Sequence, residues 1–176
     1  MRIIGGTLKG RSINPPAGYK ARPTTDFAKE GLFNSLQNEF DFEDVSVLDL
    51  FGGTGSISLE FASRGCPDIV CVEMAPANST FISRTAASFG IKEMKVVHNN
   101  VFDFLEICSR QFDIVFADPP YAIEGLDTIP DKVFSKEILT GNGYLILEHP
   151  AEYSFKEHPH FVREKKYGNV HFSWFE

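Results

Sequence analysis

A strand, a glycine-rich turn and a helix follow one another in residues 47–60, VLDLFGGTGSISLE. Gly52, Gly53 and Gly55 carry no Cβ, so the backbone can take unusual φ and ψ values and a ligand can lie directly on the main chain where the helix begins. Turns of this kind hold nucleotide-like ligands. A nicotinamide dinucleotide fold stays open at this point, because residues 53–58 fall one residue short of the pattern G-x-G-x-x-G/A.

Apolar strands alternate with amphipathic helices from Val45 onward, which is typical of a parallel sheet wound by right-handed crossovers. We therefore expect an α/β fold with a doubly wound sheet. The strands of this sheet are predicted at residues 45–50, 69–73, 95–98, 112–117 and 143–148.

Segments outside this alternation predict a helix and two hairpins. The helix runs from Phe27 to Phe40, with Thr25 or Asp26 as its cap. Near the C-terminus, two alternating segments flank a Tyr-Gly-Asn turn and predict an antiparallel hairpin over residues 161–175. Residues 2–13 predict a smaller hairpin around a Gly-Gly turn.

Size and composition favour one packed domain over residues 1–176, with an N-terminal arm (1–25) ahead of the core (26–176). Apolar residues make up 43% of the chain and aromatic residues 13%, which is ample for a core. The apolar runs are far shorter than the ~20 residues that a membrane span needs, and no signal peptide is evident. We therefore expect a cytoplasmic protein that does not enter the membrane.

No metal site is predicted. Cys66, Cys71 and Cys108 are odd in number and form no C-x-x-C pair, so neither a disulfide framework nor a zinc knuckle is indicated. His158 and His160 have no further ligand at a suitable spacing and are better explained as part of a solvated turn.

Charge is divided unevenly along the chain. Residues 1–30 hold six basic and two acidic side chains, a net charge of +4. Because the whole chain carries −7, the remaining residues carry a net charge of −11. A basic arm on an acidic body can dock phosphates locally, and an ordinary solvated face explains the same charges equally well.

Polar residues follow four of the predicted strands at their carboxyl ends, where doubly wound sheets bind ligands. Glu73 stands 21 residues beyond Gly52, a distance that suits a carboxylate accepting hydrogen bonds from ribose hydroxyls. Asn100 could contact an adenine or cap the next helix. Asp49 lies in an apolar strand, where its charge needs a cationic ligand group or nearby backbone donors.

The fourth strand ends in Asp118-Pro119-Pro120-Tyr121. One explanation of the two prolines is that they end the sheet, because neither can donate a ladder hydrogen bond. An exocyclic amine of a nucleobase is a poor nucleophile. A side-chain oxygen and a rigid backbone carbonyl that accept hydrogen bonds from its N–H groups would make it more reactive. Tyr121 would stack on the base. This combination suits amino-methylation and has no use in hydride transfer.

The D-P-P-Y motif, 66 residues after Gly52, resembles that of class I S-adenosylmethionine-dependent amino-methyltransferases. The opening RIIGG, the segments RPTTD and KEGLFN and the closing YGN resemble the RsmD family, bacterial methyltransferases that act on guanine N2 in 16S ribosomal RNA. This resemblance covers nearly the whole chain.

The resemblance implies a seven-stranded sheet, S-adenosylmethionine at the strand ends, and a monomer acting on a small ribosomal subunit or its precursor. It implies a flipped guanine at the catalytic residues Asp118, Pro119, Pro120 and Tyr121. The cofactor residues would be Asp49, Phe51, Gly52, Gly53, Gly55, Glu73, Met74, Asn100 and Val101. The RNA-binding residues would be Arg2, Lys9, Arg11, Arg22 and Lys29.

Two residues depart from the family pattern. Lys29 stands where relatives often have Arg, which weakens any bidentate contact, and Asn100 stands where many methyltransferases carry an acid. Two alternatives also stay open: a DNA adenine or cytosine amino-methyltransferase, for which the chain is short, and a non-catalytic RNA-binding or assembly module.

Overall fold

A single seven-stranded sheet, in the order β3-β2-β1-β4-β5-β7-β6, forms the centre of the computed structural model, which describes residues 1–19 and 23–176. The strands β3, β2, β1, β4 and β5 pair in parallel, and β7 pairs antiparallel with both β5 and β6. The strands are β1 (Ser46–Leu50), β2 (Asp68–Glu73), β3 (Met94–His98), β4 (Phe112–Ala117), β5 (Leu139–His149), β6 (Phe161–Tyr167) and β7 (Val170–Phe175). The predicted doubly wound, mostly parallel sheet is confirmed.

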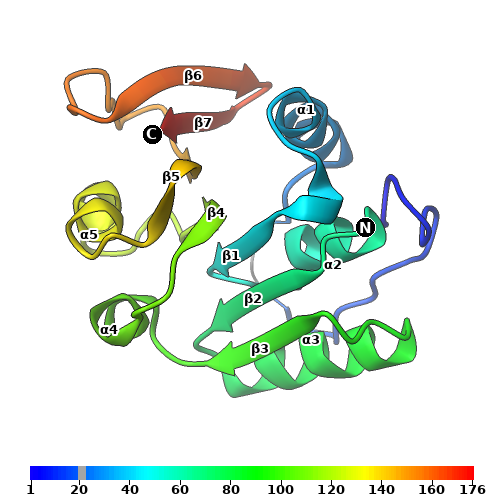
Figure 1. The fold of residues 1–176 in the computed structure, drawn as a ribbon. Coiled ribbons are helices and arrows are strands. Elements are labelled where there is room, and N and C mark those ends of the chain that lie inside the picture. The colour runs from blue at the N-terminus through cyan, green and yellow to red at the C-terminus, as the bar shows by residue number, and fades with distance from the viewer. Residues whose placement is uncertain (20–22) are drawn as a thin grey trace.

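Helices cover both faces of the sheet: α1, α2 and α3 lie on one side, and α4 and α5 on the other (Figure 1). Successive strand residues point to opposite faces, so Val47 packs under α1 and α2 while Leu48 packs under α4 and α5. The helices are α1 (Asp26–Gln37), α2 (Ser56–Ser63), α3 (Pro76–Ser88), α4 (Val101–Ile107) and α5 (Ile129–Ser135), with 3-10 turns η1 (Phe42–Asp44) and η2 (Leu126–Thr128).

Local signals in the sequence explain where α1 begins and ends. The Thr25 hydroxyl accepts a hydrogen bond from the Ala28 N–H, so Thr25 is the cap. The helix ends at Gln37, three residues before the predicted end, and Phe40 lies in the connection that leads to η1.

The N-terminal arm is not a two-stranded hairpin. Its ends meet in a single antiparallel bridge, Arg2 with Ser12, and residues between them form turns. The turns are held by α2, since the Glu60 carboxylate accepts the N–H groups of Ile4 and Gly5 and the Ser63 carbonyl accepts that of Thr7. The predicted hairpin is therefore reduced to its two ends, where the N–H groups of Ile3 and Ile13 donate to the carbonyls of Arg11 and Met1, while the donors of the intervening turns bind α2.

The C-terminal hairpin is confirmed, and it packs against α1. The Tyr167 hydroxyl donates to the Gly31 carbonyl at 3.0 Å, and a Cβ on Gly31 would stand only 2.1 Å from the Tyr167 ring. Gly31 thus permits the close approach of two segments that are 136 residues apart.

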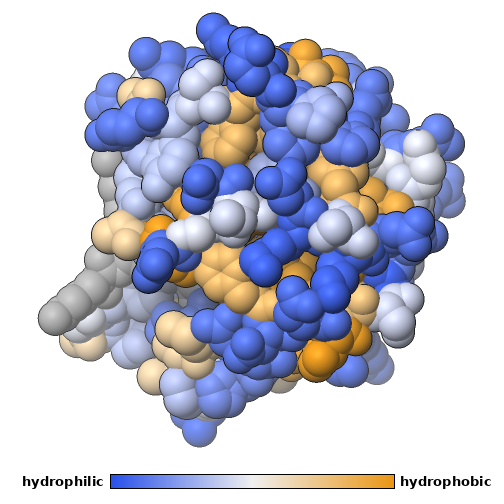
Figure 2. All heavy atoms as spheres, turned by 90° about the vertical axis from the view of Figure 1, so that its left-hand side faces the viewer, coloured by the Kyte–Doolittle hydropathy of each residue, from blue (hydrophilic) through white to orange (hydrophobic). Residues whose placement is uncertain are grey.

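The face that carries α4 and α5 is mostly hydrophilic, with smaller hydrophobic areas between the polar residues (Figure 2). Among the described residues, no helix is long and apolar enough to span a membrane.

Candidate active site

The strand order reverses between β1 and β4, and the two principal motifs of the sequence follow these two strands. The glycine-rich turn comes directly after β1, and Asp118 directly after β4. A reversal of this kind opens a crevice at the carboxyl ends of the strands, where doubly wound sheets bind their ligands.

The turn after β1 is tight and strained. Phe51 has a φ of 69°, which is uncommon outside glycine, and Gly53 and Gly55 have φ values of 59° and 77°. A Cβ on Gly52 would lie 2.4 Å from the Cys71 sulfur. The turn needs glycine for its conformation and for its packing on β2, and it leaves its backbone open to a ligand.

Glu73 closes β2 beside this turn. Its carboxylate accepts hydrogen bonds from the Gly53 N–H at 2.8 Å and the Ala75 N–H at 2.7 Å. A carboxylate has about four lone-pair sites, so acceptor capacity remains for ribose hydroxyls. The side chain holds the glycine-rich turn against the start of α3, and its contact with a ribose stays a prediction.

Asp49 is buried, and its partner is a side chain that the sequence did not point to. The Ser58 hydroxyl, from α2, donates to its carboxylate at 2.6 Å. Burial raises the pKa of Asp49 to about 7, hydrogen bonds from Ser58 oppose the rise, and the nearby Glu73 carboxylate adds to it. A cationic ligand in the crevice would favour the ionised form.

Asn100 caps α4, as the alternative prediction held. Its amide oxygen accepts the N–H groups of Phe102 and Asp103 at 2.8 and 3.3 Å. An adenine contact would have to share this oxygen and stays a prediction. Nearby, Met74 exposes 61% of its surface at the end of β2, and Val101 is buried in the first turn of α4.

Four side chains from three segments of the chain meet at the end of β4. The Thr24 hydroxyl lies 3.4 Å from carboxylate oxygens of both Asp118 and Glu148, and the Tyr121 hydroxyl donates to Glu148 at 3.1 Å. Burial raises the pKa of Asp118 well above its usual range, and the neighbouring Glu148 carboxylate raises it further. Asp118 and Tyr121 thus share the neighbouring Glu148 side chain, and their roles toward a base stay predictions.

Glu148, Thr24 and Tyr19 are residues of this site that the sequence analysis missed. Glu148 lies near the end of β5, so the rule that polar residues at the carboxyl ends of strands merit inspection would have found it. Tyr19 could not be found, because it lies in an irregular segment that turns back over Gly53. A Cβ on that glycine would stand 2.9 Å from the Tyr19 hydroxyl.

Tyr19 lies between the two halves of the site. Burial raises its pKa to about 12, and the carboxylates of Glu73 and Asp118 contribute to the rise. The phenol therefore stays protonated and can donate a hydrogen bond to either half.

Lys29 is no RNA contact, which corrects the prediction. Its side chain is fully buried, and its ammonium group donates to the Arg2 carbonyl at 2.6 Å and the Ser56 hydroxyl at 3.0 Å, with the Glu60 carboxylate at 3.3 Å. Burial lowers its pKa, against the opposing effect of Glu60. Lys29 joins the arm and α1 to α2 and cannot reach a phosphate.

The other basic residues of the arm have different surroundings. Arg2 pairs with Asp26 at 3.0 Å and remains largely exposed. Lys9 is exposed, and the Arg11 guanidinium lies over the Phe89 ring, just beyond the end of α3. Because α2 and α3 lead away from the carboxyl edge and the arm contacts their C-terminal ends, Lys9 and Arg11 lie away from the glycine-rich turn. Arg22 lies outside the described residues.

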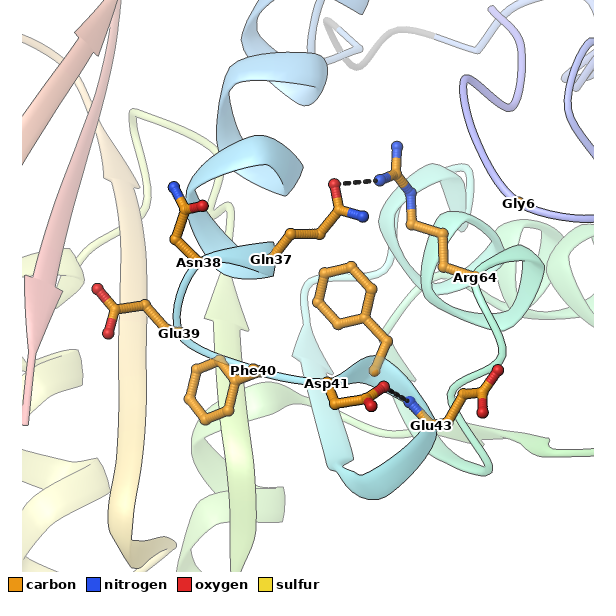
Figure 3. A pocket seen from close by; sticks show the side chains of 9 residues that line it. Gly6, Gln37, Asn38, Glu39, Phe40, Asp41, Glu43 and Arg64 are labelled. Atoms are coloured by element: carbon orange, nitrogen blue, oxygen red, sulfur yellow. Dashed lines mark hydrogen bonds between the residues drawn. The ribbon is translucent and has the colours of Figure 1, made fainter.

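A surface pocket lies elsewhere, where α1 ends and the chain enters β1 (Figure 3). The Arg64 guanidinium donates to the Gln37 side-chain oxygen across it at 3.3 Å. Its position at the amino ends of the strands separates it from Asp118 and Glu73, so it is not part of the candidate site. The pocket is lined by Gly6, Gln37, Asn38, Glu39, Phe40, Asp41, Phe42, Glu43 and Arg64.

The residues at the carboxyl edge fit S-adenosylmethionine. Asp49, Glu73, Asp118 and Glu148 place four carboxyl groups around the crevice, and such a concentration is favourable when the ligand is cationic. The glycine-rich turn leaves its backbone accessible, and the exposed Met74 offers an apolar surface for a base.

Comparisons with known proteins agree with this geometry. The family model described as "Conserved hypothetical protein 95" matches residues 1–176. The chain is 32% identical to "Putative rRNA methyltransferase YlbH" of Bacillus subtilis, over 89% of this chain and 86% of that protein. It is 36% identical to "Ribosomal RNA small subunit methyltransferase D" of Escherichia coli, over 69% of this chain and 60% of that protein.

Solved structures extend the likeness to the whole fold. "Putative methyltransferase yhhF from Escherichia coli" matches with a TM-score of 0.86 and 30% identity, and the match covers 99% of this chain and 96% of that one. The chain therefore belongs to the RsmD family of S-adenosylmethionine-dependent methyltransferases.

Proposed function

We propose that the chain transfers a methyl group from S-adenosylmethionine to the exocyclic N2 amine of a guanine in 16S ribosomal RNA. The observation that carries the proposal is the position of Asp118-Pro119-Pro120-Tyr121 beside the glycine-rich turn, at the reversal of strand order. The names of the relatives support ribosomal RNA as the substrate. We further propose that the enzyme acts as a monomer, a single domain over residues 1–176, on a small ribosomal subunit or its precursor.

The residues divide the work between the two halves of the crevice. Gly52, Gly53 and Glu73 would hold the cofactor, which supplies an electrophilic methyl group on a positively charged sulfur. Asp118 and the Pro119 carbonyl would accept the N–H bonds of the amine and so direct its lone pair toward that methyl group. The Tyr121 ring, 40% exposed, would stack on the flipped base.

Proton balance sets the state in which Asp118 works. The amine nitrogen would gain a bond to the methyl carbon as the bond from that carbon to sulfur breaks, and it would then lose one proton to the Asp118 carboxylate or to solvent. Only an ionised Asp118 can take up that proton, and its raised pKa means that it holds a proton more readily than an exposed carboxyl group. The cationic cofactor next to it would favour the ionised form.

The experiment is mass mapping of 16S ribosomal RNA from cells with and without the gene. The proposal expects one N2-methylguanine to be lost, and to return when purified protein and labelled cofactor are added to small subunits from the deficient cells. Unchanged RNA, together with methyl transfer to adenine or cytosine in DNA, would instead support the DNA alternative.

A further inference from the structure

Glu148 has no role in the mechanism above, although it lies beside the catalytic Asp118. Its carboxylate is 5% exposed, and the Thr24 hydroxyl lies within 3.4 Å of both carboxylates. Burial of a second acidic group so close to Asp118 is costly unless donors satisfy it.

The Tyr121 hydroxyl shows which part of a bound base Glu148 would meet. This hydroxyl donates to one oxygen of Glu148, while the other oxygen faces Thr24 and, through it, Asp118. A base that stacks on the Tyr121 ring and offers its amine to Asp118 therefore has the edge next to that amine directed toward Glu148. A carboxylate has about four acceptor sites and can accept hydrogen bonds from several donors at once.

Guanine and adenine differ at this edge. In guanine the ring N1–H is a donor directly beside the N2 amine, whereas an unprotonated N1 is an acceptor and would face a carboxylate with its lone pair. We propose that Glu148 accepts the N1–H of the target guanine and selects guanine over purines whose N1 carries no hydrogen. This inference rests on the proposed function and names a specificity residue for it.

A site built to hydrogen-bond a substrate group rejects an analogue that lacks the group, because a buried polar side chain is left unpaired. Glu148→Gln should relax this choice, since an amide can accept from N1–H or, after rotation, donate to a bare N1. The variant keeps the size of the side chain and can still accept from Tyr121.

The test uses small subunits assembled with 16S RNA that carries guanine or 2-aminopurine at the methylated position. Both bases have the N2 amine, but N1 of 2-aminopurine has no hydrogen. We expect the wild-type enzyme to prefer guanine by at least about 100-fold in kcat/KM. Glu148→Gln should narrow this preference by about tenfold or more. Glu152 is an exposed acid just after β5, and Glu152→Gln is therefore the matched control. It should leave the preference unchanged.

Because the readout is a ratio of two substrates on one enzyme preparation, partial misfolding of a variant cancels. The two bases also differ at position 6, which can itself affect the wild-type ratio of kcat/KM values. The inference is therefore tested by the change in this ratio between wild type and Glu148→Gln. An equal preference in wild type and Glu148→Gln would overturn the inference. Absence of any guanine methylation by the wild type would instead overturn the proposed function.

Discussion

Glu73 supports the glycine-rich turn, and we propose that the same side chain binds the ligand. Its two backbone hydrogen bonds, to Gly53 and Ala75, fix the carboxylate at the edge of the crevice. A side chain held in this way loses little conformational entropy when a ligand binds. Its hydrogen bonds to the ligand therefore contribute almost all of their free energy to the affinity.

Glu73→Ala is expected to weaken S-adenosylmethionine binding by about tenfold or more, because hydrogen bonds to a charged acceptor are worth ~1.5–3 kcal/mol. Calorimetric titration measures this, with Glu93→Ala as the control, an exposed acid near the start of β3. Wild-type affinity in Glu73→Ala would remove Glu73 from the cofactor site.

Asp49 makes stability depend on pH. Its folded pKa of about 7 lies above the unfolded value of about 3.9, so the folded state binds more protons between these values. Stability should therefore fall as pH rises from 4 to 7. Asp49→Asn, which can still accept from Ser58, should flatten the decline by about 1–3 kcal/mol between pH 5 and pH 8 in urea unfolding. Parallel pH profiles would show that the carboxyl group does not titrate there.

At the scale of elements, the N-terminal arm depends on α2 for its conformation. Ile3 and Ile13 are fully buried against Leu59 of α2, and Glu60 accepts two arm N–H groups while it faces Lys29. The sequence signal for Lys29 was its helical spacing, since Phe33 and Leu36 follow it at i+4 and i+7 on the buried face of α1. Charge alone suggested a surface residue.

Removing one partner of this buried ion pair should be strongly destabilising. We expect Lys29→Met to lower the free energy of unfolding by about 3–5 kcal/mol, because Glu60 keeps its charge but loses a buried cation. Urea denaturation measures the loss, and Glu30→Gln, an exposed neighbour on α1, should change it little. A loss below about 1 kcal/mol would mean that Arg64, 2.9 Å from Glu60, suffices.

Exposed charges of the arm should act on RNA and not on the cofactor. Neutralising Lys9 and Arg11 together is expected to flatten the dependence of RNA binding on salt, since each phosphate contact adds roughly 0.7–0.9 to the slope. Binding to small subunits at several salt concentrations measures this, with cofactor affinity as the control. An identical slope would leave both residues a structural role only.

At the scale of the whole molecule, periodic signals predicted the fold and irregular segments escaped prediction. The five parallel strands, the C-terminal hairpin and the position of Asp118 at the end of β4 all follow from alternation and from the carboxyl-end rule. The turns of the arm did not, because the N–H groups of Ile4 and Gly5 bind the Glu60 side chain of α2 rather than a neighbouring strand. Tyr19 also escaped, because no local pattern reports a contact with residues far along the chain.

The central claim is that Asp118 activates the amine at this edge of the sheet. Single-turnover transfer of labelled methyl to undermethylated small subunits tests it most directly, with cofactor binding measured on the same preparations and Asp127→Ala, an exposed acid of η2, as the control. We expect Asp118→Ala to slow transfer by about 100-fold or more while it keeps cofactor affinity, because the lost interaction strengthens as the amine becomes positive. Transfer by Asp118→Ala at near the wild-type rate would contradict the mechanism.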